Sequence, residues 1–293
     1  MPIDIDFRKD YELIMKEELR TVGIVIDQTI PYDDIPYIYH NFMKRNIKPQ
    51  PRNILKASDF NCPTDLIPGL DNLERKIISG DDLKPHLSKS VFTQYEGTDY
   101  LLNDWGVHHL HLGITIENGF VKRTNSVLFC IVTENTIYFI TIKEHKKWHE
   151  QDILKTVYIN WVELIEPFIM NGVISVVNKP TDDNVKSLRY GHIMYPIEID
   201  TGVVIYPPGG GYTTDGTSNE VVKKVFSSMR IITNFEEKIK ANENNIRRYI
   251  IKKNKTPAKT MKFKLEFKND NMIAYEVYSK VLIPYDAELL NSQ

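Results

Sequence analysis

The spacing of apolar positions predicts short helices in the first third of the chain. Ile35, Tyr39 and Phe42 recur every three or four residues and would share one face of a helix over about residues 33–45. A second helix is predicted over about residues 69–78, because a glycine two positions further on can end it in a left-handed conformation. Prolines between these segments keep the connections irregular.

The middle of the chain changes to the β-branched and aromatic content of strands. Residues 126–132 and 137–142 are apolar runs separated by Thr-Glu-Asn-Thr, which predicts a β-hairpin. The segment before the hairpin, residues 108–116, is short and strand-like. A helix is predicted to start at about Glu144, and another to lie around residues 161–168.

The last third combines both patterns. Residues 194–206 predict another hairpin, and residues 262–283 predict a final one. Between them, residues 219–253 form the longest amphipathic helical segment, which we expect to break near residues 233–234.

These helices and strands are mixed but do not alternate as strand-helix-strand units. The sequence therefore predicts an α+β fold whose sheet is built from antiparallel hairpins. We expect a helical N-terminal region at residues 1–95 and a histidine-containing α+β core at residues 96–175. Residues 176–293 would form a C-terminal α+β region with a long basic helix and a terminal hairpin.

The composition indicates a soluble protein of the cytoplasm. The chain of 293 residues is 42% hydrophobic and 26% charged, which is too apolar for disorder throughout. Two cysteines, Cys62 and Cys130, make no disulfide framework in a chain of this length and favour a reducing compartment. The N-terminus lacks the pattern of a signal peptide, and no apolar run approaches the roughly 20 residues of a membrane helix.

The formal net charge of -2 conceals a strongly basic segment. Residues 223–268 carry 14 basic and 4 acidic side chains, whereas the rest of the chain is acidic. A basic amphipathic helix can follow a phosphate backbone, and the alternative is an ordinary solvated helix face. The side chains that we expect to bind nucleic acid are Lys223, Lys224, Arg230, Arg247, Arg248, Lys252 and Lys253.

A glycine-rich loop at residues 209–216 precedes this basic helix. Backbone amides at a helix N-terminus favour anions, so the loop could hold a phosphate. Its glycines match neither the P-loop nor the dinucleotide-binding pattern, and a mobile surface loop is the better interpretation.

Five of the eight histidines lie between residues 108 and 149. On a strand, His109 and His111 share one face at a separation of roughly 6.5–7 Å, while His108 points to the core face. On a helix, His145 and His149 are four residues apart and also share a face. The two pairs flank the predicted hairpin, and a compact fold could bring them together.

Acid–base catalysis is the first interpretation of this cluster. Histidine has an unperturbed pKa of about 6.5, so one imidazole can accept a proton while another donates one. Cleavage of RNA needs such a pair, here His109 and His111 with assistance from His145. Asp104 would orient an imidazole, and Arg123 would stabilise the charge of the phosphoryl group. This mechanism requires no cofactor.

A metal site is the second interpretation. His109, His111, His145 and His149 could supply up to four nitrogen ligands to a divalent ion such as Zn or Mn, with Asp104 as a further ligand or as the residue that orients one. In the third interpretation the cluster is structural: His108 packs in the core, and the other imidazoles form ordinary hydrogen bonds or lie exposed.

Two resemblances accompany these patterns. The run Leu-Leu-Asn-Asp-Trp-Gly-Val-His-His-Leu-His-Leu-Gly at residues 101–113, after Pro-His-Leu-Ser-Lys at residues 85–89, resembles a group of poorly characterised bacterial proteins associated loosely with mobile and defence loci. This resemblance covers about residues 81–170. A histidine segment followed by Arg123, a hairpin and His145 also resembles the barnase/RelE-like ribonuclease toxins, which implies metal-independent RNA cleavage.

The leading hypothesis is therefore a cytoplasmic nuclease, more specifically an RNase, acting as a toxin or phage-defence effector. Its expected partners are RNA or another nucleic acid, together with an antitoxin or another defence protein, and no membrane. One alternative is a metal-dependent hydrolase that uses the same histidines. The other is a non-enzymatic protein that binds nucleic acid or a partner protein.

Overall fold

The structure, a computed structural model, describes residues 3–269 and 271–290 and divides into two compact units. The central unit comprises residues 40–222, and the terminal unit comprises the described parts of residues 1–39 and 223–293. The two boundaries fall within α2 (Ile35–Arg45) and α9 (Asn219–Ala241). This division differs from the three consecutive regions expected from the sequence, because the two ends of the chain fold together.

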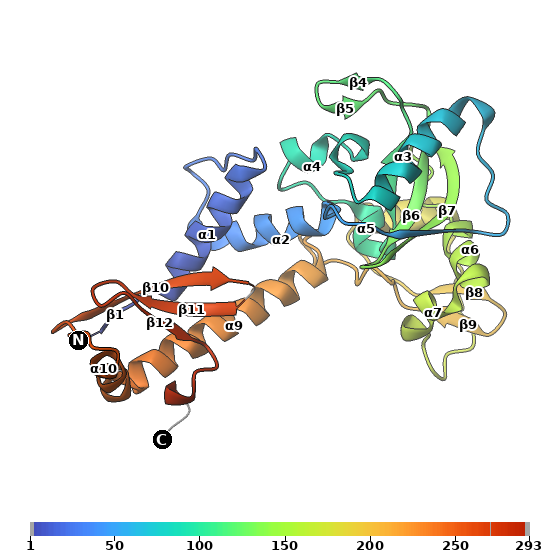
Figure 1. Cartoon of the computed structure of the whole chain (residues 1–293). Coiled ribbons are helices and arrows are strands. Elements are labelled where there is room, and N and C mark those ends of the chain that lie inside the picture. Colours follow the sequence, from blue (N-terminus) through green and yellow to red (C-terminus); the bar gives the residue numbers. More distant parts are fainter. Residues whose placement is uncertain (1–2, 270, 291–293) are drawn as a thin grey trace. The chain divides into compact units, whose positions relative to one another are not determined.

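A mixed four-stranded sheet forms the centre of the central unit (Figure 1). Its strand order is β2 (Asn53–Lys56), β7 (Thr136–Glu144), β6 (Ser126–Val132) and β3 (His108–His111). The β6–β7 hairpin confirms the prediction, and β3 also pairs antiparallel with β6. Because β2 pairs parallel with β7, the sheet is only in part the antiparallel one expected.

The remaining elements of the central unit surround this sheet. The side chains Val127, Phe129 and Ile140 are fully buried and belong to one hydrophobic core together with Trp105 and Leu154. The other helices and strands are α3 (Ile67–Ser79), α4 (Ser90–Thr93), α5 (Tyr100–Trp105), α6 (Asp152–Asn160), α7 (Val162–Ile165), α8 (Asp182–Tyr190), β4 (Ile116–Glu117), β5 (Phe120–Val121), β8 (Ile197–Asp200) and β9 (Val203–Ile205). Mixed helices and sheets confirm the α+β fold class.

The terminal unit contains a second sheet, in the order β1 (Ile3–Asp4), β10 (Met261–Lys268), β11 (Asn271–Glu276) and β12 (Val281–Pro284). The acidic N-terminal segment packs directly against the lysine-rich strand. In α1 (Phe7–Thr21), the two carboxylate oxygens of Asp10 accept from Lys264 Nζ at 2.8 Å and from the backbone N–H of Leu265 at 3.0 Å. These bonds join residues about 250 positions apart.

The long basic helix is interrupted at a different place from the one expected. α9 continues through residues 233–234, because Ile232, Phe235 and Ile239 keep their helical spacing inside the core of the terminal unit. The interruption lies at Asn242, before α10 (Glu243–Lys252). None of the described helices is both long and apolar enough to cross a membrane.

The glycine-rich loop is packed against α5 instead of lying on the surface as a mobile segment. The N–H of Gly209 donates to the carbonyl oxygen of Asp104, and the N–H of Gly211 donates to that of Asn103, both at 2.8 Å. These bonds satisfy carbonyls at the end of α5 that lack helical partners. The loop therefore fixes α5, and these two amides are already used.

Close backbone packing also fixes the chain directly after β3. A Cβ atom added to Gly69 in α3 would lie 1.7 Å from the carbonyl oxygen of Leu112. We predict that Gly69→Ala lowers the free energy of unfolding by about 1–3 kcal/mol, because the backbone of α3 and that of Leu112 must move apart to make room for the methyl group. The matched control is Gly191→Ala, where the nearest atoms lie at an ordinary 3.5 Å. Urea unfolding of the two variants checks this, and equal stabilities would contradict the close approach.

Candidate metal centre

Three histidines predicted from the sequence come together in the central unit. His109 and His111 lie two residues apart on β3, which pairs with one edge of β6. His145 directly follows β7, which pairs with the other edge of β6. The N–H of His145 donates to the carbonyl of Asn125 at 2.7 Å, and Asn125 directly precedes β6. This bond holds His145 close to the end of β3, where His111 lies opposite Val127.

The geometry of this three-histidine cluster (His109, His111 and His145) suits a single ion. One ring nitrogen from each residue lies within 4.8 Å of the other two. Two nitrogens bound at about 2.1 Å to one tetrahedral ion are about 3.4 Å apart, so the three imidazoles would have to move together by roughly 1 Å to bind it. Trp148 packs its ring edge-on against His109 and His145, with centroids 4.9 and 4.7 Å away.

The environment keeps the three imidazoles neutral, which is the form that binds metal. Burial, and then the positive charges and imidazoles nearby, lower the pKa of His111 to about 3. Burial also lowers the pKa of His109 and of His145. Both ring nitrogens of His111 and the Nδ1 of His109 are buried without a hydrogen-bond partner among the described residues. A protonated acid beside a neutral base, as the leading hypothesis requires, is disfavoured here.

The prediction of a helix starting at about Glu144 is wrong, so His145 and His149 do not share a helical face. Residues 145–150 form turns, and α6 begins only at Asp152. His149 therefore does not join the three-histidine cluster, although its Nδ1 is buried and has no hydrogen-bond partner in the described structure.

Asp104 does not orient an imidazole, contrary to the expectation. The chain forms α5 through Trp105 and turns at Gly106, whose φ is 71°, before β3 starts. On α5, the Oδ2 of Asp104 accepts from the Nε of Arg189 at 2.6 Å, and both side chains are buried. Burial raises the pKa of Asp104, and the guanidinium opposes that rise. This ion pair joins α5 to α8.

Arg123 lies on the surface, near enough to the three-histidine cluster for its charge to lower the pKa of all three imidazoles. His108, which we expected on the core face, instead lines a cavity beside the cluster, and its burial there lowers its pKa to about 4. His108 is the first residue of β3, where it lies opposite Cys130.

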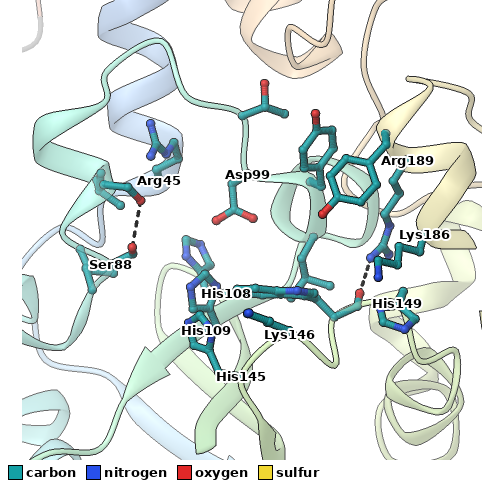
Figure 2. Close-up of a pocket in the computed structure, with 18 residues that line it drawn as sticks. Arg45, Ser88, Asp99, His108, His109, His145, Lys146, His149, Lys186 and Arg189 are labelled. Carbon is teal, nitrogen blue, oxygen red and sulfur yellow. Dashed lines mark hydrogen bonds between the residues drawn. The ribbon is translucent and has the colours of Figure 1, made fainter. Parts of the chain in front are cut away.

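The cavity has a volume of about 530 Å³ and is bordered by His109 and His145 of the cluster (Figure 2). Four basic side chains and one carboxylate line it, and one of the four, Arg189, is paired with the buried carboxylate of Asp104. The charged residues of the lining are Arg45, Lys146, Lys186, Arg189 and Asp99. The central unit as a whole carries 18 basic and 22 acidic side chains, so the cavity has the opposite charge balance from the unit around it.

The basic residues expected to bind nucleic acid all belong to the terminal unit. Several of these side chains already interact with other groups of that unit. Arg247 binds Glu243 and two backbone carbonyls, and the Nζ of Lys253 lies over the ring of Tyr249.

No protein-family model, curated protein or solved structure matches this chain. The assignment of a function therefore depends on the geometry of the site.

We predict that Asp104→Asn lowers the free energy of unfolding by about 3–5 kcal/mol, because it leaves the buried charge of Arg189 uncompensated. Glu17→Gln is the control, since it breaks an exposed ion pair with Arg20 and should leave stability close to that of the wild type. Urea unfolding followed by tryptophan fluorescence measures both variants. If Asp104 only oriented an imidazole, its variant would keep wild-type stability.

Proposed function

We propose that this protein is a metal-dependent nuclease whose divalent ion is held by His109, His111 and His145. The observation that carries the proposal is the convergence of three imidazoles, with nitrogens within 4.8 Å of one another, beside a cavity lined by basic side chains. Their unpartnered nitrogens favour a ligand, because buried polar atoms are costly when they lack a partner. Imidazole ligands suit zinc, and manganese is the second ion to test.

The site chemistry supports hydrolysis of a phosphate ester. An ion held by three protein ligands keeps an open position and acts there as a Lewis acid on a water or on a phosphoryl oxygen. That position would face the cavity, since His109 and His145 line it. Lys146 follows His145 directly, and its charge lowers the pKa of His145, so its ammonium lies close to where a scissile phosphate would bind.

A nucleic acid is the proposed source of this phosphate, and RNA in the cytoplasm is the first substrate to test. Four basic side chains lining the cavity of a net-acidic unit favour an anion. A role as a toxin or phage-defence effector remains part of this proposal. Metal-free acid–base cleavage and simple binding are the alternatives.

Metal content tests the centre directly. We predict close to one zinc or manganese ion per purified chain, and less than about a tenth of that in His111→Ala and His145→Gln, each of which removes one of three ligands. His145 is only partly buried, so we expect His145→Gln to fold normally. This variant therefore tests the metal site even if His111→Ala does not fold. The control is His192→Asn, outside the cluster, where asparagine tolerates the φ of 54°. Mass spectrometry of the metals gives the stoichiometry.

Chelation then separates the alternatives. RNA cleavage should stop with a chelator and return with the metal. Cleavage that continues without metal would favour histidine acid–base chemistry. If neither RNA nor DNA is cleaved with or without divalent metal, the nuclease proposal fails.

Replacing Lys146 should lower the activity of the protein without lowering its stability. Its φ is 88°, a conformation that costs a non-glycine residue about 1 kcal/mol. Lys146→Gly should therefore keep or raise the Tm while lowering the single-turnover rate of RNA cleavage about tenfold. Asn118→Gly, at a φ of 52° in the turn between β4 and β5, is the control and should leave the rate unchanged. A destabilised Lys146 variant with full activity would show that the lysine serves only the turn.

A further inference from the structure

Helix α8 contributes two basic side chains to the cavity at some distance in sequence from the histidines. Lys186 and Arg189 lie three residues apart on this helix, so they share one face, and both line the cavity (Figure 2). Lys186 is exposed and forms no ion pair with any described residue. Its ammonium is therefore available to an anion in the cavity.

Arg189 is held rigidly beside it. Its side chain is only 5% exposed, its Nε donates to Asp104, and its Nη1 donates to the carbonyl of Trp148. The guanidinium also stacks 3.9 Å from the ring of Trp105. The Nη2 has no hydrogen-bond partner among the residues described. A fixed guanidinium with an unused donor is preorganised for a planar or tetrahedral oxyanion.

The cavity size limits what this anion can belong to. A volume of about 530 Å³ lies within the range of roughly 300–1,000 Å³ typical of small-molecule sites. This volume is large enough for one nucleotide. The aromatic rings of Tyr100, Trp148 and Tyr190 also line it, and aromatic side chains bind bases by stacking.

We propose that Lys186 and Arg189 form a subsite for the terminal phosphate of a single nucleotide unit. This unit is either a free nucleotide or the phosphorylated end of a single strand. The catalytic consequence rests on the proposed function and applies to a strand end: with its end phosphate bound on α8, the strand would be hydrolysed at the three-histidine cluster, which borders the same cavity. Hydrolysis there would add one water across a P–O ester bond and yield a phosphate monoester and an alcohol, so cleavage would begin at strand ends.

Calorimetry on metal-free, chelator-treated protein tests the subsite apart from catalysis. The probes are adenosine monophosphate and inorganic phosphate. We expect both to bind the wild type, with adenosine monophosphate the tighter of the two, and Lys186→Gln to bind each about tenfold more weakly. The control is Lys155→Gln on α6, an exposed lysine that does not line the cavity, whose affinities should stay within about twofold. Absence of binding, or equal weakening in both variants, would overturn the subsite.

Oligonucleotides distinguish the two sources of the phosphate. Single-stranded hexaribonucleotides carrying a 5′-phosphate, a 3′-phosphate or none are titrated into the same metal-free proteins. Preference for one phosphorylated end, lost in Lys186→Gln, identifies a strand end, and binding of the mononucleotide alone identifies a free nucleotide. Equal binding of all three hexamers contradicts the proposal. Failure of the nuclease proposal is seen separately, as nucleotide binding without cleavage in the metal-loaded protein.

Discussion

The pairing of β6 with both of its neighbours is the constraint on which the candidate metal centre depends. β3 and β7 each run antiparallel to β6, with His111 opposite Val127 and Val127 opposite Lys143. His145 lies two residues beyond Lys143, so the end of β3 and the end of β7 meet across one strand. A slip of one residue in either register would turn its side chains to the other face. Core packing of Val127 prevents this slip, since that side chain is fully buried.

The cluster formed in this way is costly for an apoprotein. Three imidazoles lie with ring centroids 5.6–6.1 Å apart, and several of their buried nitrogens have no protein partner within the described chain. A structural role would pair such nitrogens with carbonyls or carboxylates: the Nδ1 of His86 pairs with the carbonyl of His111 and only its Nε2 lacks a partner, whereas both ring nitrogens of His111 lack one within the described chain. An acid–base role would require one of the three to hold a proton, which burial opposes. A bound cation would take one nitrogen from each imidazole, and for this reason we favour the metal centre over the other two roles.

Local patterns were sufficient to predict the parts of the site that depend on neighbouring residues. The β-branched runs predicted the β6–β7 hairpin, and strand alternation predicted that His109 and His111 share one face and lie close together. Longer-range contacts were not predictable in this way. The partner of Asp104 is Arg189, 85 positions away, and no spacing rule relates the two. The turn after β7 carries helix-like spacing of His145 and His149, which tertiary contacts override.

The distribution of charge also differs between the sequence and the folded chain. The basic segment looks like a nucleic-acid surface when its charges are counted along the sequence. Folding places the acidic N-terminal segment in the same unit, where Asp10 pairs with Lys264 and Asp4 with Lys262, and the terminal unit totals 19 basic and 17 acidic side chains. The cavity of the central unit differs from this, because four basic side chains line it although the unit as a whole has a net charge of -4. Because electrostatic attraction acts over distances in space, of about 10 Å at moderate salt, the cavity is the stronger argument for a phosphate-bearing substrate.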